Sequence, residues 1–202
     1  MTAILQKQFK KLMKDGSQNV QLHTLSNPWS SKYQLAAYAY IAEQYGYCYM
    51  GLAPYSSTGR TYPDFGFIRL PDAEERARYT QEQYPNPLPY GPFPGMLQGG
   101  DGLTPRPDVR PEVDLLHAQI QVDLLGDFGK KRLWRLAILA PIGLFLGLLL
   151  KGLTPTSALI AGCLSVAYAL YLRLVRVVML RKLAKYQRVL QAAGNTWPLT
   201  VN

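Results

Sequence analysis

Carboxylate side chains are missing from the last third of this sequence. All thirteen Asp and Glu residues lie between Asp15 and Asp127, whereas half of the 22 Lys and Arg residues follow Asp127. The net charge of +9 therefore comes from the two ends of the chain. A basic surface suits either nucleic acid or an anionic membrane. Because the basic residues flank apolar runs, we expect the membrane as the partner and no nucleic acid.

Cysteine and histidine are also scarce. The only cysteines are Cys48 and Cys163, so no disulfide framework is indicated. His23 and His117 are far apart in the sequence, and neither has a cysteine at metal-ligand spacing. The sequence has no nucleophile elbow, zincin helix or Walker-type phosphate loop. We therefore expect no metal, no cofactor and no catalytic residues.

Two long uncharged runs dominate the C-terminal third. The runs 136–150 and 152–172 contain no charged residue, and only Lys151 separates them. The first run has no polar stripe on any face. A helix needs about 17–25 residues to cross the hydrocarbon core, so the first run is near the lower limit. The sequence predicts transmembrane helices at 133–151 and 155–174, joined as a helical hairpin.

Basic and aromatic residues flank both predicted spans. Because basic residues stay on the cytoplasmic side, both chain termini should be cytoplasmic, at the inner membrane of a bacterium, with the turn outside. Trp and Tyr rings favour the membrane interface, and Arg side chains reach the headgroups along their apolar stems. The predicted membrane-interface residues are Lys130, Lys131, Arg132, Trp134, Arg135, Tyr171, Arg173 and Arg176.

Small residues recur at intervals of four within both predicted spans. Gly143 and Gly147 lie in the first, and Ala161, Ser165 and Ala169 lie in the second. Small residues allow helix backbones to approach closely in lipid. The stripes predict either packing of the two spans on each other or association of several copies into a homo-oligomer.

The N-terminal part of the chain predicts a small α+β domain. Residues 1–15 form a basic amphipathic helix that either lies on the membrane or packs its apolar side on the domain. Within residues 20–84 we expect a helix at 32–45, after a serine cap and before Gly46. Aromatic, alternating residues predict strands at 47–52 and 65–70 that pair as an antiparallel hairpin. Asp72 and Glu75 have the spacing of a capping box for a helix ending near Gln83.

Proline and glycine dominate residues 85–111. This composition favours extended and flexible chain, so the segment is either a linker or a docking strip for a partner protein. The candidate docking residues are Pro87, Pro89, Tyr90, Pro92, Phe93 and Pro94. A membrane-proximal helix at 112–129 follows, and residues 175–202 form a basic tail with a helix at 174–193.

These features together predict a helix–strand–strand–helix domain, a two-helix transmembrane hairpin and a basic C-terminal helix. The function that fits them best is a non-enzymatic membrane adaptor or accessory subunit, part of an envelope or secretion-type assembly. Its partners would be the lipid bilayer and other membrane or cytosolic proteins. The alternatives are a self-assembling channel or membrane-active effector, and an immunity or regulatory protein that binds a membrane-associated partner.

Overall fold

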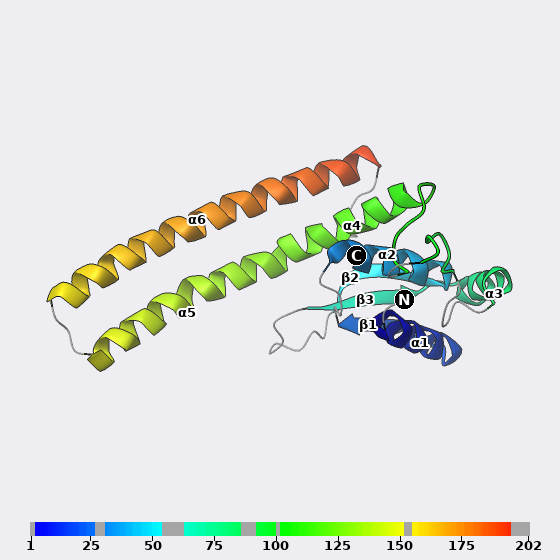
Figure 1. Ribbon diagram of the computed structural model, residues 1–202, viewed down its shortest axis with the longest axis horizontal. Helices are drawn as coiled ribbons and strands as arrows, with labels where there is room; N and C mark the ends of the chain where they lie inside the picture. The colour runs from blue at the N-terminus through cyan, green and yellow to red at the C-terminus, as the bar shows by residue number, and fades with distance from the viewer. Residues whose placement is uncertain are drawn as a thin grey trace. The chain divides into compact units, whose positions relative to one another are not determined.

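The computed structural model divides the chain into two compact units (Figure 1). It describes residues 3–26, 31–53, 63–85, 92–99, 102–151 and 155–194. The first unit, here called the N-terminal domain, comprises Met1–Ile120 with Val189–Asn202, and the second, the helical unit, comprises Gln121–Arg188. The elements are α1 (Ala3–Ser17), β1 (Leu22–Ser26), α2 (Lys32–Gln44), β2 (Tyr47–Leu52), β3 (Asp64–Arg69), α3 (Ala73–Gln83), α4 (Arg110–Leu125), α5 (Asp127–Lys151) and α6 (Pro155–Ala192).

The N-terminal domain is built on a three-stranded antiparallel sheet with the order β1-β3-β2. The predicted hairpin is confirmed, because β2 pairs with β3, with a register shift between Tyr49 and Gly51. The strand β1, which pairs with the other edge of β3, was not predicted. Its alternation is partly hidden, because one of its two inward residues is the fully buried His23 and the other is Leu25.

Helices α1 and α2 pack on the same face of the sheet. Side chains from both helices contact the inward-facing His23, and the Tyr38 ring of α2 also packs edge-on against Phe67 of β3. The predicted ends of α2 are confirmed: the Ser31 side chain accepts a hydrogen bond from the Tyr33 amide, and Gly46 adopts φ +86° just beyond the helix. Ala36 to Ala42 are all buried, so α2 is the central helix of this core.

The apolar side of α1 is part of the domain core. Leu5, Phe9 and Leu12 are at most 2% exposed, and the Phe9 ring packs edge-on against Tyr45 at 5.0 Å. Of the two alternatives for the N-terminal helix, the structure therefore shows packing on the domain. The helix extends two residues beyond the predicted end at residue 15, through Gly16 to Ser17.

The helix α3 lies where it was predicted, but the predicted capping box does not form. The Asp72 side chain makes no capping hydrogen bond, and its carboxylate instead accepts a hydrogen bond from Arg76 Nε at 2.7 Å. Arg76, one helical turn after Asp72, thus binds the carboxylate that would otherwise accept a hydrogen bond from the first backbone amides of α3. A hydrogen bond links α3 to α2, because the Thr80 hydroxyl donates to the Gln44 carbonyl at 2.7 Å.

Part of the segment predicted to be a linker is packed into the core. Between residues 92 and 109 the structure buries Phe93, Met96, Leu103 and Val109, each at most 8% exposed. An isolated antiparallel bridge joins Met96 to Pro105. The linker prediction is therefore corrected for residues 92–99 and 102–109, because proline and glycine exclude long helices and strands but leave buried turns possible. The next helix, α4, begins at Arg110, two residues before the predicted start.

The helical unit contains the paired helices α5 and α6. The helix α5 has 25 residues and α6 has 38, with Pro141 inside α5. The predicted second span and basic tail helix are one continuous helix, because no helix-breaking residue separates them. Within the part of the chain that the structure describes, one helical stretch, Gly162–Ala192, is long and apolar enough to cross a membrane. The structure thus supports one candidate span directly and does not show two.

Candidate functional site

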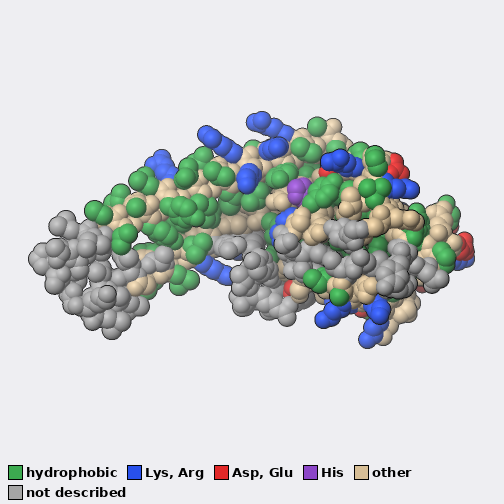
Figure 2. All heavy atoms as spheres, viewed as in Figure 1, with side chains coloured by type: hydrophobic (Ala, Val, Ile, Leu, Met, Phe, Trp, Pro, Cys, Tyr) green, Lys and Arg blue, Asp and Glu red, His purple; other side chains and the backbone are tan. Residues whose placement is uncertain are grey.

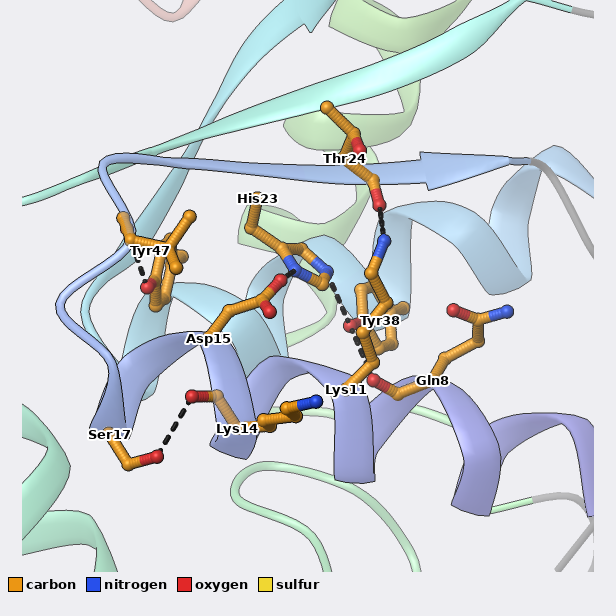
Figure 3. Close-up of polar contacts among 10 residues, drawn as sticks. Gln8, Lys11, Lys14, Asp15, Ser17, His23, Thr24, Tyr38 and Tyr47 are labelled. Carbon is orange, nitrogen blue, oxygen red and sulfur yellow. Dashed lines mark hydrogen bonds and ion pairs between the residues drawn. The ribbon is translucent and has the colours of Figure 1, made fainter.

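A buried polar network surrounds His23 inside the N-terminal domain (Figure 3). The His23 ring is fully buried on β1. Its Nδ1 lies 2.6 Å from the Asp15 carboxylate of α1, and its Nε2 lies 3.2 Å from the Tyr38 hydroxyl of α2. The Tyr38 hydroxyl also lies 3.3 Å from the Gln8 carbonyl of α1. The network therefore ties α1, α2 and the sheet together through one imidazole.

The electrostatics of His23 suit a structural role. Burial lowers the pKa of His23 below 6.5, and this effect outweighs the hydrogen bond to Asp15, which raises it. The neutral ring then carries its proton on Nδ1 toward Asp15, and its Nε2 faces the Tyr38 hydroxyl, whose single proton is shared between Nε2 and the Gln8 carbonyl. Because the ring is enclosed by Tyr47 and Phe67 as well, a substrate has no path to it. The sequence offers no clear signal for this role, because Leu22 and Leu25 are three residues apart and lie on opposite faces of the strand, and only the fold shows that His23 shares the inward face with Leu25.

A small cavity of about 240 Å³ lies beside this network, between α1 and α3. Tyr45 and Arg69 help to line it, and Tyr45 Oη and Arg69 Nε are buried without a hydrogen-bond partner among the described residues. The Arg69 guanidinium binds Glu74 through Nη2 at 3.2 Å. No group of three or more His, Cys, Asp or Glu side chains able to hold a metal ion occurs among the residues described.

In the helical unit, α5 and α6 run antiparallel and in contact. The Tyr168 hydroxyl of α6 donates a hydrogen bond to the Leu136 carbonyl of α5 at 2.9 Å. Farther along, a methyl group added at Gly129 would lie 3.1 Å from Met179 Sδ, so the two helices also come close together there. Met179 is accordingly only 8% exposed.

A groove of about 690 Å³ lies between α5 and α6 near their basic ends. It is here called the α5–α6 groove. Its residues are of two kinds, cationic and apolar, and none is acidic. The lining comprises Lys130, Leu133, Trp134 and Ala137 of α5, with Leu172, Arg173, Arg176, Met179 and Leu180 of α6. Such a surface can hold an anionic group and an apolar chain side by side.

Half of the predicted membrane-interface residues meet in this groove. Lys130 and Trp134 come from α5, and Arg173 and Arg176 come from α6. The side chains of Lys131, Arg135 and Tyr171 are exposed on the same helices but do not line the groove. The side chain of Arg132 lies outside the described part. Sequence reasoning placed these residues at one depth but could not show that two helices bring four of them together.

The small-residue stripes do not form a close contact where the structure describes them. A methyl group at Gly143 would meet no atom within 4 Å, and Ser165 and Ala169 are exposed. The surroundings of Gly147 and Ala161 lie outside the described residues. The described small residues are therefore open to lipid or to another chain rather than filled by the partner helix.

The described part of the predicted docking strip is half-buried or buried. Pro87, Pro89 and Tyr90 lie outside the described residues. Pro92 is half-buried, whereas Phe93 and Pro94 are buried, and the Phe93 ring packs edge-on against Phe9 at 5.0 Å. Phe93 is a core residue, so it is not available as a surface contact for a partner.

Comparison with known proteins does not narrow the function. No protein-family model, no curated protein and no solved structure matches this chain.

Proposed function

We propose that this protein is a non-enzymatic, membrane-anchored adaptor or accessory subunit whose helices α5 and α6 form a two-span hairpin. In this arrangement the hairpin holds the N-terminal domain at the cytoplasmic face of an inner membrane. The observation that carries the proposal is the exposed apolar surface of α6, on a helix long enough to cross the hydrocarbon core.

The exposed residues of α6 form a continuous apolar surface. Leu164, Val166, Leu170 and Leu174 are between 52% and 64% exposed. Soluble monomers rarely expose contiguous apolar surface on this scale, because each such side chain would gain roughly 1.5–3 kcal/mol on leaving water. Lipid would supply the missing apolar environment around these side chains. Figure 2 shows many hydrophobic side chains, in green, on the visible face of the helical unit.

The antiparallel partner of α6 has the length and surface for a second span. Its residues 133–151 extend about 28 Å, close to the thickness of about 30 Å of the hydrocarbon core. Among its described side chains, Leu139 is 64% exposed and Ile142 is 50% exposed. The proline at position 141 is compatible with this role, because proline is tolerated in transmembrane helices.

The charge distribution supports the proposed orientation. The basic ends of α5 and α6 both lie on the side of the helix pair away from the Lys151–Pro155 connection. No acidic residue follows Asp127 to offset them. Positively charged flanks stay on the cytoplasmic side, so the N-terminal domain, which precedes α5 in the chain, would be cytoplasmic as well.

Insertion and orientation can be tested with cysteine labelling of the full chain in membranes. On a Cys48→Ser/Cys163→Ser background, Lys151→Cys should react with a membrane-impermeant maleimide from outside. Gln191→Cys, the matched control near the other end of α6, should react only after the membrane is opened. Recovery of the protein in the soluble fraction after alkaline carbonate extraction would contradict the anchor. Labelling of both sites from the same side would contradict the two-span topology.

The adaptor role can be tested by purification in a mild detergent. A stoichiometric partner should be retained by the wild-type chain and lost from Pro87→Ala/Tyr90→Ala. The matched control is Tyr79→Ala on α3, because Tyr79 is 62% exposed and belongs to the same domain but not to the strip. Isolation of the wild-type chain alone would refute the adaptor proposal.

The open small residues favour one second candidate, a self-assembling channel or membrane-active effector. Gly143 has nothing within 4 Å of an added methyl group, so it could accept a helix from another copy. Gly143→Leu should then reduce crosslinked oligomers and any ion conductance in reconstituted bilayers. An anchored adaptor that works as a single copy would be unaffected by this substitution.

A further inference from the structure

We propose that the α5–α6 groove binds the headgroup of an anionic phospholipid of the cytoplasmic leaflet, with an acyl chain along its apolar wall. The inference rests on the proposed insertion of α5 and α6 into the membrane and adds a specific ligand to it. Four observations carry it: the composition of the groove, the convergence of its cations, its depth along the helices and the lack of acidic residues among those that line it.

The composition of the groove matches the two parts of a phospholipid. Three cationic side chains, Lys130, Arg173 and Arg176, line the same cavity as six apolar ones. Guanidinium groups present paired donors that fit the oxygens of a phosphate, and the ammonium group of lysine adds a point charge. The apolar wall continues into the exposed side chains of the proposed spans, of which Leu170 is 64% exposed.

The cations converge although they come from different helices. Arg173 and Arg176 are three residues apart on α6 and so share a face of that helix. Lys130 approaches from α5, because the two helices are antiparallel and touch through Gly129 and Met179. A phosphate in the groove can therefore contact both helices at once. That geometry differs from the diffuse attraction that any basic helix end exerts on a negative membrane surface.

The groove also lies at the depth of the headgroups. Arg173 follows Pro155, the first residue of α6, by 18 residues, and Lys130 precedes Lys151, the last residue of α5, by 21. At about 1.5 Å per residue these separations are about 27 and 32 Å, close to the hydrocarbon thickness of about 30 Å. With the Lys151–Pro155 connection at one membrane surface, the cations of the groove reach the other surface. Trp134, which is 70% exposed beside them, is the ring type favoured there.

The charge of the lining residues favours an anionic phospholipid over a second copy of the chain or a free phosphate. No lining residue of the groove is acidic, so an anion bound beside Arg173 and Arg176 would meet positive charge with no carboxylate in the lining. A second copy of this chain would bring the same basic helix end into the groove and would be repelled. A free phosphate would satisfy the cations but would leave Leu133 and Leu172 without an apolar partner. An anionic phospholipid satisfies both sides of the groove.

Lipid retention by the full-length protein in detergent micelles provides the test. The protein is held in detergent micelles that contain equal amounts of phosphatidylglycerol and phosphatidylcholine. Micelles lack the extended negative surface of a membrane leaflet, which would attract any basic helix. Native mass spectrometry then counts the lipids that each protein retains. Wild-type protein should retain one phosphatidylglycerol in preference to phosphatidylcholine. Arg173→Gln/Arg176→Gln should lower that preference about tenfold, which is the effect of losing one to two charge-assisted contacts. The matched control, Arg181→Gln/Arg188→Gln, removes the same charge from exposed positions of α6 outside the groove and should keep the preference.

Each alternative result is distinct. Equal retention of the two lipids by the wild type, or equal losses in the two double variants, would overturn the proposal. Displacement of phosphatidylglycerol by inorganic phosphate at equal concentration would show a site for the anion alone and would also overturn it. A dimer that replaces the lipid in the wild type would assign the groove to a second copy. Soluble protein after carbonate extraction would instead refute the membrane anchor, which is a separate measurement.

Discussion

Phe93 provides a direct test of whether residues 92–109 belong to the core of the N-terminal domain. Its side chain is 2% exposed and packs edge-on against Phe9 at 5.0 Å, with an angle of 71° between the rings. Phe93→Ala removes a buried ring and leaves a cavity beside Phe9. Substitutions of this kind cost about 3–5 kcal/mol, a large part of the roughly 5–15 kcal/mol that stabilises a typical domain.

The cost of Phe93→Ala can be measured by hydrogen exchange of the full-length protein in detergent. The amides of the central strand β3 report global opening of the domain, because β3 pairs on both edges. A loss of about 3 kcal/mol should accelerate their exchange at least about a hundredfold. Leu97→Ala is the control from the same segment, since Leu97 is 45% exposed and its removal should cost about 0.5 kcal/mol or less.

Similar costs for the Phe93 and Leu97 substitutions would refute the assignment of Phe93 to the core. The docking alternative makes the opposite prediction for the same variant. If Phe93 bound a partner from the surface, Phe93→Ala would release that partner while the exchange of the β3 amides stayed unchanged.

Two further predictions concern pH and glycine. Because burial lowers the pKa of both His23 and His117 below 6.5, the unfolded chain binds protons that the folded chain excludes. Stability should therefore be fully present above about pH 6.5 and fall as the pH drops through the lowered folded-state values. Denaturant unfolding of the wild type and of His117→Gln between about pH 7.5 and 5 measures this. The variant should lose less stability on acidification than the wild type, and equal losses would contradict the reasoning. The comparison separates histidine from Glu43, whose pKa is raised by burial and which acts in the opposite direction. Gly46→Ala should cost at least about 2 kcal/mol, because φ is +86° and the new methyl group would overlap the backbone of Ala73. Gly99→Ala, at φ +103° but in open space, should cost about 1 kcal/mol, and equal costs at the two sites would contradict the close packing at Gly46.

Local signals in the sequence were sufficient for most elements of the N-terminal domain. The serine cap before α2, the glycine at its end and the alternation of the two hairpin strands each act within a few residues, so they are readable without the fold. The capping box failed because Arg76 binds the Asp72 carboxylate, a competition that the spacing of Asp72 and Glu75 does not reveal. The strand β1 was missed because a buried histidine interrupts its apolar pattern.

The fate of the proline-rich segment depended on the rest of the domain. Its composition excludes long regular elements, but it does not say whether the turns are solvated or buried. Phe93 and Leu103 become core residues because α1 presents Leu5 and Phe9 at the right place to cover them. That arrangement joins parts of the chain more than eighty residues apart, so no local pattern encodes it.

The sequence by itself determined where this chain is apolar, where it is charged and on which side of the apolar runs the charge lies. Hydropathy and charge along the chain depend only on neighbouring residues, so they can be read without the fold. The apolar surface of α6 follows from them. Only the tertiary structure decided that α1 packs on the domain, that His23 joins α1, α2 and β1, and that cations of α5 and α6 share one groove. Each of these depends on the direction in which side chains from distant elements point, and that direction is set by packing rather than by composition.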